Sequence, residues 1–501
     1  MSARRIVALP VDGRPVVRAQ VQSLVACAGW KLAMPAVADL GHLRRPAERD
    51  RLAAWLAAEA PGAAGFVLSL DMLAYGGLVP SRFIADELDA LKQRLDLLPA
   101  LKAAYPGAPI YAFAATMRIS NNDVNEEEKE YWSQYGSLIW RWSYLADRAA
   151  MRGDPEDVAA AQAARDAIPA PIREDYLDTR ARNAALVEHA LELVADGSID
   201  RLVLPQDDTA EFGFNIAERR RLERRVVELG LDQRVAIYPG ADEVMHTLCA
   251  RMVGALAGVA PLSFHLHCSD PEHVASLRAL YEDRPLLAAV ASQVAAVGGR
   301  IAAGAEEADV ILAIHTSGPA QGDWAMQKPL PQPVAPAPDW LAALAAWHAA
   351  GKPIALADLA YANGGDPVMV GAVAATLPLR GLAAYAGWNT ASNSLGSLLA
   401  QCVLARADYR APANRAVLCL RLLEDLVYQA IVRQAVRLGA CEADLAPAAL
   451  RERVALAFAP HATAWARGHG LGFEVANVYL PWDRSFEIGI DLAPAREASC
   501  N

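Results

Sequence analysis

Residues 201–208 read RLVLPQDD, a short apolar run of strand-forming residues that ends directly in an amide and two adjacent acids. The same arrangement recurs at residues 65–71 (GFVLSLD) and at residues 234–243 (RVAIYPGADE). Branched and aromatic residues in short apolar runs predict buried strands. Because helical patterns separate these runs, the sequence predicts an α/β protein with a largely parallel sheet that is covered on both faces.

Ten such runs predict the strands of the sheet. They lie at residues 6–10, 32–37, 65–70, 109–115, 201–205, 234–238, 262–267, 309–314, 354–357 and 382–386. Helices are predicted between them at 49–59, 86–103, 217–229, 242–258, 272–281 and 284–298. We expect a (β/α)8-barrel-like parallel sheet, since ten strands is near the number in an elaborated barrel. Two doubly wound α/β domains are the alternative, because periodicity does not show whether a sheet closes.

The domain organisation follows from the places where this rhythm breaks. We expect an α/β catalytic domain over residues 1–400, with a helical insert at 120–185 that is rich in Trp and acidic residues. The stretch 327–339 (QKPLPQPVAPAPD) predicts an extended, stiff connector, because proline fixes the backbone. Residues 401–501 are expected to form a helical C-terminal region that ends in a hairpin at 472–491.

Composition excludes several classes of protein. The 501 residues are 54% hydrophobic and 21% charged, which excludes a disordered chain. Lys and Arg number 47 against 58 Asp and Glu, a net charge of −11 without a basic block, so we expect no nucleic-acid partner. The chain has no signal-peptide core and no membrane-spanning apolar stretch, and its seven cysteines form no CxxC pair. We therefore expect a cytoplasmic protein without a membrane partner, and the sequence leaves its oligomeric state open.

Polar residues collect immediately after the predicted strands. In parallel sheets the ligand site lies beyond the carboxyl ends of the strands, so these residues predict one polar site built from many loops. Each single loop is also explained by helix or turn capping. Their amide, carboxylate, guanidinium and aromatic groups suit a neutral, hydroxyl-rich carbohydrate. The candidate substrate-binding residues are Asp12, Arg14, Asp71, Tyr75, Arg118, Asn121, Asn122, Asp123, Asn363, Asp366, Trp388, Asn389 and Asn393.

Two adjacent acid pairs are the candidate catalytic residues: Asp207 with Asp208, and Asp242 with Glu243. Glycoside hydrolysis needs one protonated and one ionised carboxyl group. Residues 240–243 (GADE) are similar to the strand-end Gly-Asp-Glu of substrate-assisted hexosaminidases, and Asp207-Asp208 resembles the acid pair of O-linked N-acetylglucosaminidases. The sequence therefore favours a glycoside hydrolase of a small sugar or glycoside, with an N-acetylhexosaminide as one candidate substrate and no cofactor.

A metal-dependent hydrolase is the first alternative. His265 and His267 share one face of a predicted strand, and His315 and Asp358 end later strands, so these four residues are candidate ligands of Zn or Mn. The second alternative is a non-catalytic sugar-binding protein. Nucleotide cofactors are disfavoured because no phosphate-binding glycine motif follows a strand, and a serine nucleophile is not supported because GxSxG is absent.

Six longer strings resemble a bacterial domain family of unknown function whose members have about 500 residues. They are residues 9–15 (LPVDGRP), 70–82 (LDMLAYGGLVPSR), 206–209 (QDDT), 238–243 (YPGADE), 358–366 (DLAYANGGD) and 386–396 (AGWNTASNSLG). The likeness spans roughly residues 5–400. The chain departs from the family pattern at Gly13, where Ser is more usual. The resemblance implies no activity, and it supports treating the strand-end motifs as one functional set.

Overall fold

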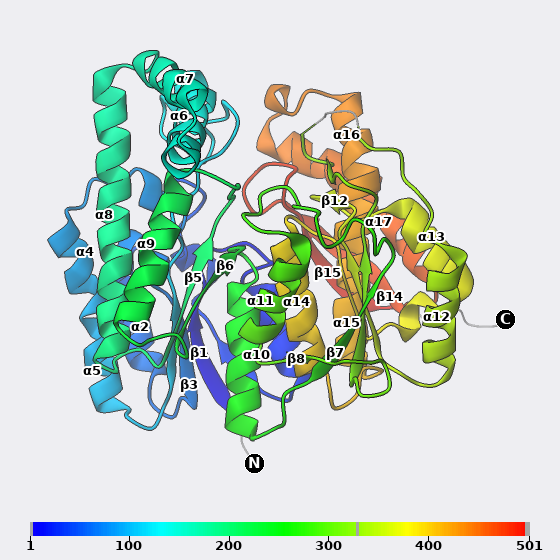
Figure 1. Ribbon diagram of the computed structural model, residues 1–501. Coiled ribbons are helices and arrows are strands. Elements are labelled where there is room, and N and C mark those ends of the chain that lie inside the picture. Colours follow the sequence, from blue (N-terminus) through cyan, green and yellow to red (C-terminus); the bar gives the residue numbers. More distant parts are fainter. Residues whose placement is uncertain (1–3, 327–329, 496–501) are drawn as a thin grey trace. The chain divides into compact units, whose positions relative to one another are not determined.

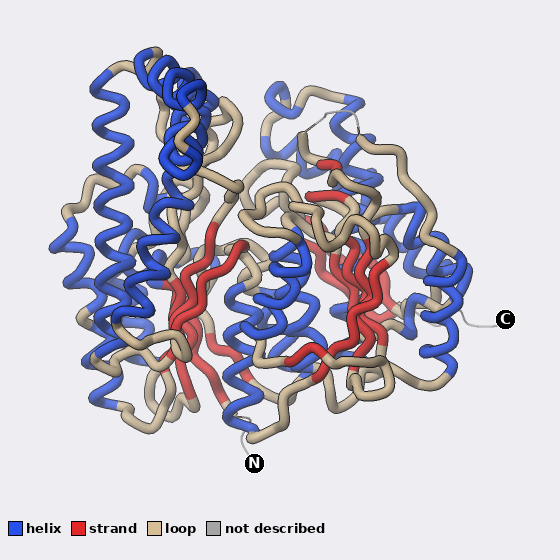
Figure 2. The backbone as a smooth tube through the Cα atoms, in the orientation of Figure 1, coloured by secondary structure: helices blue, strands red, loops and turns tan. Residues whose placement is uncertain are grey.

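The computed structural model describes residues 4–326 and 330–495. The first three residues of the connector predicted at 327–339, and the last six of the predicted C-terminal region, lie outside the described residues. Residues 330–337 of the connector have no regular secondary structure. The chain divides into two compact units, each with its own parallel sheet (Figures 1 and 2). The predicted α/β class is therefore confirmed, whereas closure into one barrel and the boundary at residue 400 stay predictions.

The first unit comprises residues 1–13, 31–248 and 281–284. Its six strands are all parallel, in the order β2-β1-β3-β4-β5-β6. Their bounds are β1 Arg5–Leu9, β2 Lys31–Ala33, β3 Gly65–Ser69, β4 Ile110–Phe113, β5 Arg201–Gln206 and β6 Val235–Pro239. The order reverses direction at β1, because β2 lies on one side of it and β3 on the other. Ligands bind at such reversal points, beyond the carboxyl ends of the strands.

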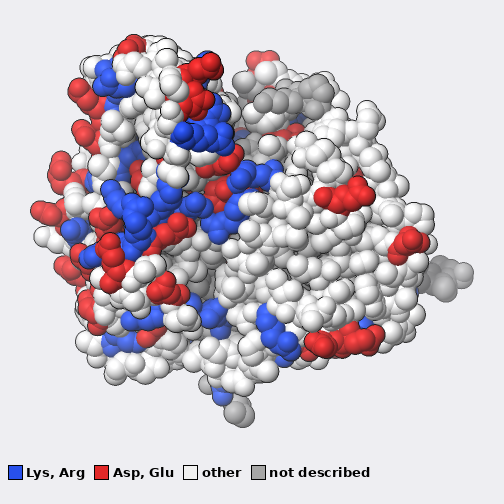
Figure 3. All heavy atoms as spheres, in the orientation of Figure 1, with Lys and Arg blue, Asp and Glu red and all other residues white. Residues whose placement is uncertain are grey.

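Helices cover this sheet and bury its apolar face. The strands and helices α2, α4, α5, α8 and α9 share one hydrophobic core, and α8 and α9 run along one side of the sheet in Figure 1. The helices of this unit are α2 Arg49–Glu59, α3 Leu70–Tyr75, α4 Leu88–Leu95, α5 Leu97–Ala104, α6 Trp132–Arg152, α7 Pro155–Asp166, α8 Ala170–Ala195, α9 Phe214–Glu228 and α10 Val244–Ala257, which continues into the second unit, with the 3₁₀ turns η1 Val37–Asp39 and η2 Pro80–Arg82. On the face drawn in Figure 3, basic and acidic side chains are interleaved over α8 and α9, so this surface is of mixed charge.

The predicted helical insert consists of α6, α7 and most of α8. It has a small core of its own, in which Trp132 and Trp142 pack with Tyr176 and Ile168. The rings of Trp132 and Tyr176 lie 5.7 Å apart between centroids. Because this core also takes in Met117 and Ile119, it holds the chain that follows β4.

The second unit comprises residues 14–30, 249–280 and 285–501. Its five main strands are parallel in the order β13-β11-β9-β7-β8, which again reverses direction at the unit's first strand, β7. The strands are β7 Ser263–Cys268, β8 Arg300–Ile301, β9 Val310–His315, β11 Ile354–Asp358 and β13 Ala384–Ala386, with a separate short pair, β10 Gly322–Asp323 and β12 Tyr361–Ala362.

Helices again lie on both sides of this sheet (Figure 1), and those of the C-terminal region belong to the same core. They are α1 Ala19–Cys27, α11 Leu286–Ala296, α12 Pro338–Ala349, α13 Pro367–Thr376, α14 Ala391–Leu404, α15 Pro412–Arg421, the π-helix η4 Leu422–Val432, α16 Arg433–Gly439 and α17 Pro447–Gly468, with the 3₁₀ turns η3 Leu379–Gly381 and η5 Glu442–Asp444. The predicted terminal hairpin is confirmed, because β14 Phe473–Tyr479 pairs antiparallel with β15 Gly489–Pro494.

Two predicted elements need correction. The prediction of a helix at 272–281 is wrong, because these residues form turns and irregular backbone. The Asp270 carboxylate accepts the backbone N–H of His273 at 3.3 Å and lies 2.9 Å from its ring Nδ1, and such local side-chain bonds compete with helix propagation. The strand predicted at 32–37 ends at Ala33, close to Pro35, which has no N–H to donate to a sheet. Among the described residues, no helix is long and apolar enough to cross a bilayer.

Candidate functional site

The first unit gathers its polar residues beyond β3, β4 and β5. Helix α3 begins directly at the end of β3, where Ser69 Oγ accepts the N–H of Met72 at 3.1 Å. This sharp strand-to-helix turn buries Asp71, whose Oδ2 accepts the N–H of Ala115 after β4 at 2.9 Å. The motif at 70–82 therefore joins the ends of β3 and β4.

Arg82, at the end of the same motif, is 1% exposed and reaches the loop after β5. Its Nη2 donates to Asp207 Oδ2 at 3.0 Å. Its Nη1 donates to the backbone oxygen of Glu127 at 3.0 Å and lies 3.3 Å from the carboxylate of Glu128. A fixed guanidinium fork thus holds the first acid of the QDDT string.

Arg118 holds the second acid. Its Nη1 donates to Asp208 Oδ2 at 2.9 Å, and its Nε donates to Glu128 Oε1 at 2.8 Å. Its Nη2 lies 3.1 Å from Glu127. Burial alone lowers the pKa of Arg118, but these carboxylates outweigh it and hold the pKa well above its ordinary value. We call Arg82, Arg118, Glu127, Glu128, Asp71, Asp207 and Asp208 the acidic cluster.

Two carboxyl groups of the acidic cluster hold a proton near neutral pH. Burial raises the pKa of Asp208 to about 7, with Asp207 and Glu127 adding to the rise and Arg118 opposing it. Burial likewise raises the pKa of Asp71 to about 7, although the bond from Ala115 lowers it. The Asp208 side chain is still 24% exposed, so a ligand can reach it. Its backbone is left-handed, with φ at +33°, which turns it away from the extended path of β5.

The second predicted acid pair follows β6. Asp242 and Glu243 are 4% and 1% exposed. The carboxylate of Glu243 folds back over Gly240, so that a Cβ at Gly240 would lie 2.5 Å from Glu243 Oε1. Asp242 and Glu243 are therefore shielded from solvent, whereas the Asp208 side chain is partly exposed.

Other predicted residues of the first unit have local roles. Asn122 Oδ1 accepts the N–H of Val124 at 2.9 Å in a turn, and Asp123 accepts the N–H of Ser137 of α6 at 2.8 Å. Asn121 is exposed, whereas Asp12 and Tyr75 are buried. Asn122 and Asp123 therefore shape the loop after β4, through hydrogen bonds to the backbone of a turn and of α6.

The remaining predicted binding residues belong to the second unit. Arg14 lies 4.6 Å over the ring of Trp482. The others lie beyond β11 and β13, where Asn389 is partly exposed and the remaining four are buried: Asn363, Asp366, Trp388 and Asn393. Asn363 and Asn389 have left-handed backbones, and the N–H of Asn363 donates to Asn389 O at 2.9 Å. The predicted residues thus form two groups, one within each unit.

The candidate metal ligands of the second unit have other contacts. His267 stacks on Trp340 with centroids 5.7 Å apart, and His265 packs against Trp347. Asp358 Oδ2 accepts Tyr385 OH at 3.0 Å, and burial raises the Asp358 pKa to about 7. Within 4–326 and 330–495, no group of three or more His, Cys, Asp or Glu side chains is arranged to hold a metal ion.

Ser269 was missed by the sequence analysis, although His315 and Asp366 were among the predicted residues. Ser269 Oγ lies 3.0 Å from His315 Nδ1, and His315 Nε2 lies 3.1 Å from Asp366 Oδ2. Ser269 directly follows β7 and His315 ends the neighbouring strand β9. No GxSxG string marks this serine, so only the pairing of these strands reveals it.

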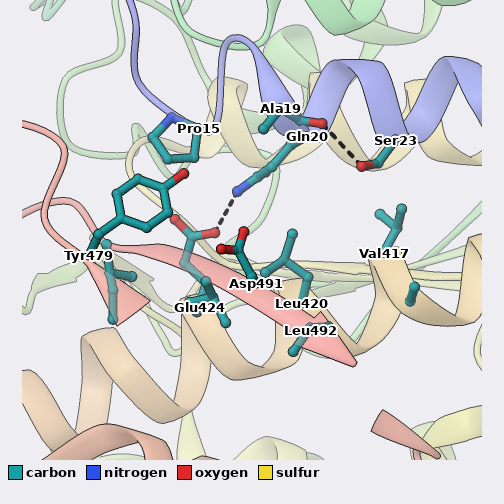
Figure 4. A pocket seen from close by; sticks show the side chains of 13 residues that line it. Pro15, Ala19, Gln20, Ser23, Val417, Leu420, Glu424, Tyr479, Asp491 and Leu492 are labelled. Carbon is teal, nitrogen blue, oxygen red and sulfur yellow. Dashed lines mark hydrogen bonds between the residues drawn. The ribbon is translucent and has the colours of Figure 1, made fainter. Parts of the chain in front are cut away.

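A cavity of about 270 Å³ lies elsewhere in the second unit, lined by α1, α15, η4 and the terminal hairpin. Figure 4 shows Glu424 and Asp491 at its polar end, with Gln20 Nε2 donating to Glu424 Oε2 at 2.5 Å. Burial raises the pKa of Glu424 to about 8, and Asp425 adds to the rise while Arg421 opposes it. The Glu424 carboxyl is thus protonated near neutral pH.

Comparison with known proteins gave one match. The family model described as a protein of unknown function (DUF4127) matches residues 6–491. Neither the curated proteins nor the solved structures gave a match. The match spans both units and includes every candidate site residue named above.

Proposed function

Because the chain belongs to the DUF4127 family of proteins of unknown function, its activity is inferred from its own side chains, and we propose a glycoside hydrolase whose acid pair is Asp207 and Asp208. The observation that carries this proposal is that the two adjacent acids have different arginine partners and that one of them has a raised pKa. Each is held by a different arginine, and the more exposed one keeps a proton near neutral pH. General acid catalysis works best with a pKa near the working pH.

We assign the general acid to Asp208. Its pKa of about 7 leaves a useful protonated fraction, and 24% exposure leaves it open to a leaving-group oxygen. Asp207 Oδ2 lies 3.0 Å from Arg82 Nη2, and a side chain fixed in this way suits a partner that orients the substrate. In substrate-assisted hydrolysis the partner acid orients the sugar's acetamido group, so an N-acetylhexosaminide is the favoured substrate.

The excess of carboxylates over guanidinium groups in the acidic cluster supports a neutral substrate. Five acids surround two arginines, which disfavours anionic ligands. Asp71, the member of this cluster that lies at the reversal point of the sheet, is 3% exposed and is therefore screened from solvent, as Glu243 is.

The test measures hydrolysis of N-acetylhexosaminides with two kinds of leaving group, 4-nitrophenol and methanol. Nitrophenolate leaves without much help from an acid, whereas methoxide needs a proton. Asp208→Asn should therefore slow the methyl glycoside by about 100-fold or more, and the nitrophenyl glycoside much less. Asp207→Asn should slow both substrates to a similar extent, because orientation of the acetamido group is lost for both.

Two further variants complete the design. Glu243→Gln is expected to cost less than Asp208→Asn, because the Glu243 carboxyl is folded over Gly240. Asp175→Asn is the control, since Asp175 is half exposed and pairs with Lys129 on the insert. Thermal melting of each variant separates loss of catalysis from loss of fold.

Each other result points elsewhere. Normal rates in Asp207→Asn and Asp208→Asn would sink the proposal. Binding of the sugar without turnover would favour the sugar-binding alternative. Activity that a chelator abolishes, and that Zn or Mn restores, would favour the metal-dependent hydrolase.

A further inference from the structure

We propose that Ser269, His315 and Asp366 form a catalytic triad that hydrolyses carboxylic esters. This site lies within the second unit and uses none of the residues of the acidic cluster, so it is independent of the proposed glycosidase. The three side chains form one continuous hydrogen-bonded chain, from Ser269 Oγ through both ring nitrogens of His315 to Asp366 Oδ2. Nucleophile, base and orienting acid in this relation define a triad by geometry, whatever the fold or sequence order.

The sheet itself creates the pairing. Cys268 of β7 is in register with Ile314 of β9, and the N–H of Ser269 donates to Ile314 O at 2.9 Å. The next residues along, Ser269 and His315, therefore stand side by side at the carboxyl ends of these strands. Because the strand order reverses at β7, this is the reversal point at which parallel sheets bind ligands.

The hydrogen bonds assign the proton on the histidine ring. Asp366 caps α13, where its Oδ1 accepts the N–H of Val368 at 2.8 Å, and its Oδ2 faces His315 Nε2. An acceptor carboxylate at Nε2 places the ring proton on Nε2, which leaves Nδ1 free to accept the hydroxyl proton of Ser269. The N–H of Thr316 also donates to Ser269 Oγ at 3.2 Å, which stabilises charge that develops on that oxygen.

The burial of the three residues matches their roles. The side chains of His315 and Asp366 are 1% and 0% exposed, whereas Ser269 is only partly buried. The nucleophile is thus accessible while the base and its acid are shielded from water. Asp358 is a positioning residue, since its Oδ2 accepts the N–H of Asp366 at 2.7 Å.

Thr316 offers a group for the substrate's carbonyl oxygen. Thr316 is 3% exposed, and its Oγ1 has no hydrogen-bond partner among the described residues. A buried hydroxyl without a partner costs free energy, so a ligand oxygen at this position would be favoured. Thr316→Val, which keeps the shape and removes the hydroxyl, should lower kcat for ester hydrolysis with little change in KM.

The reaction balances without a cofactor. The Ser269 Oγ–acyl bond forms while the hydroxyl proton moves to His315 Nδ1, and that proton passes to the leaving alcohol as its C–O bond breaks. Water then attacks the acyl carbon, gives one proton to Nδ1, and releases the carboxylic acid as the proton returns to Oγ. Asp366 orients the ring in both steps and takes no part in the proton transfers.

The direct test is labelling of the full chain with a fluorophosphonate probe, followed by intact mass and peptide mapping. We expect one phosphonyl group on Ser269. Ser269→Ala should abolish labelling, and His315→Asn should slow it by about 100-fold or more, since general-base catalysis contributes about that much. Ser276→Ala and His273→Asn are matched controls from the same loop and should label at the rate of the unchanged protein.

Hydrolysis of 4-nitrophenyl acetate tests the role of Asp366. Asp366→Asn keeps an oxygen for the α13 cap but can turn an NH₂ toward Nε2, which reverses the ring tautomer and removes the base. We expect kcat to fall by at least about 100-fold while KM and the melting temperature change little. If Asp366 had only a structural role, Asp366→Asn would lower the melting temperature and would not lower kcat selectively.

Several results would overturn the triad. The unchanged protein could fail to label, or the probe could label a different residue. Labelling could also survive Ser269→Ala, or folded His315→Asn could label as fast as the unchanged protein. Peptide mapping on the unchanged chain needs no variant, so the proposal stays testable even where a variant fails to fold. Loss of glycosidase activity in Asp208→Asn has no bearing on this labelling, so the two proposals fail separately.

Discussion

Arg82 Nη2 donates to Asp207 Oδ2 at 3.0 Å across 125 positions of sequence. The bond joins the turn after β3 to the end of β5, two strands that are separated by β4. Arg118 makes the equivalent bond to Asp208, the next residue, at 2.9 Å. Two neighbouring acids are thus held by two arginines from different loops, and this arrangement fixes their geometry before any ligand arrives.

Replacing Arg118 should destabilise the first unit. In Arg118→Met, the carboxylates of Glu127, Glu128 and Asp208 lose a shared cation in a mostly buried place. Removing one partner of a buried ion pair costs about 3 kcal/mol of unfolding free energy. Arg94→Met is the control, because Arg94 pairs with the 93% exposed Asp50 and should cost less than about 1 kcal/mol. Equal costs in urea unfolding would contradict a buried cluster.

Asp71→Asn should change how stability depends on pH. The Asp71 pKa is raised to about 7 in the folded chain by burial, against about 3.9 when unfolded. The proton that it holds stabilises the fold fully below about pH 4, and this contribution is lost as the pH rises through about 7. The unfolding free energy of the unchanged protein, minus that of the variant, should therefore fall between pH 5 and pH 8.5. Parallel pH profiles would show that Asp71 titrates normally.

Glu424→Gln should stabilise the second unit at alkaline pH. Burial raises the pKa of Glu424 to about 8 in the folded chain, against about 4.3 when unfolded. The proton that it holds stabilises the fold fully below about pH 4, and this contribution is lost as the pH rises through about 8, whereas glutamine stays neutral. The melting temperature of the variant, minus that of the unchanged protein, should therefore be larger at pH 9 than at pH 6. Glu452→Gln, at an exposed position on α17, is the control and should show no such difference. A variant that is less stable than the unchanged protein at pH 9 would contradict the burial effect.

Gly240→Ala should disrupt the loop after β6. The backbone of Gly240 has φ at +115°, and an added Cβ would lie 2.5 Å from Glu243 Oε1. Strain and displacement of Glu243 together should cost about 3 kcal/mol. Gly258→Ala has φ at +65° and no atom within 4 Å of the added Cβ, so it isolates the backbone cost of roughly 1–2 kcal/mol. Equal melting temperatures of the two variants would mean that Glu243 moves aside without cost.

The sequence by itself determined the local features of this protein. Short apolar runs ending in polar residues located ten of the eleven strands described in the two main sheets, because alternation and β-propensity act over a few residues. They missed the two-residue strand β8. The terminal hairpin and the helical insert were predicted for the same reason. The local pattern wrongly predicted a helix at 272–281, where the Asp270 side chain accepts a backbone N–H in place of a helical hydrogen bond.

Only the tertiary structure decided which polar residues meet. Strand order and register are set by long-range packing, which no local period encodes. That packing divided the predicted residues between two units, brought Arg82 to Asp207, and placed Ser269 beside His315 across β7 and β9. It also buried Asp71 and Asp208 enough to raise their pKa, because the cost of desolvating a charge depends on the whole surrounding fold. The residue types came from the sequence, and their chemistry from the contacts that folding gave them.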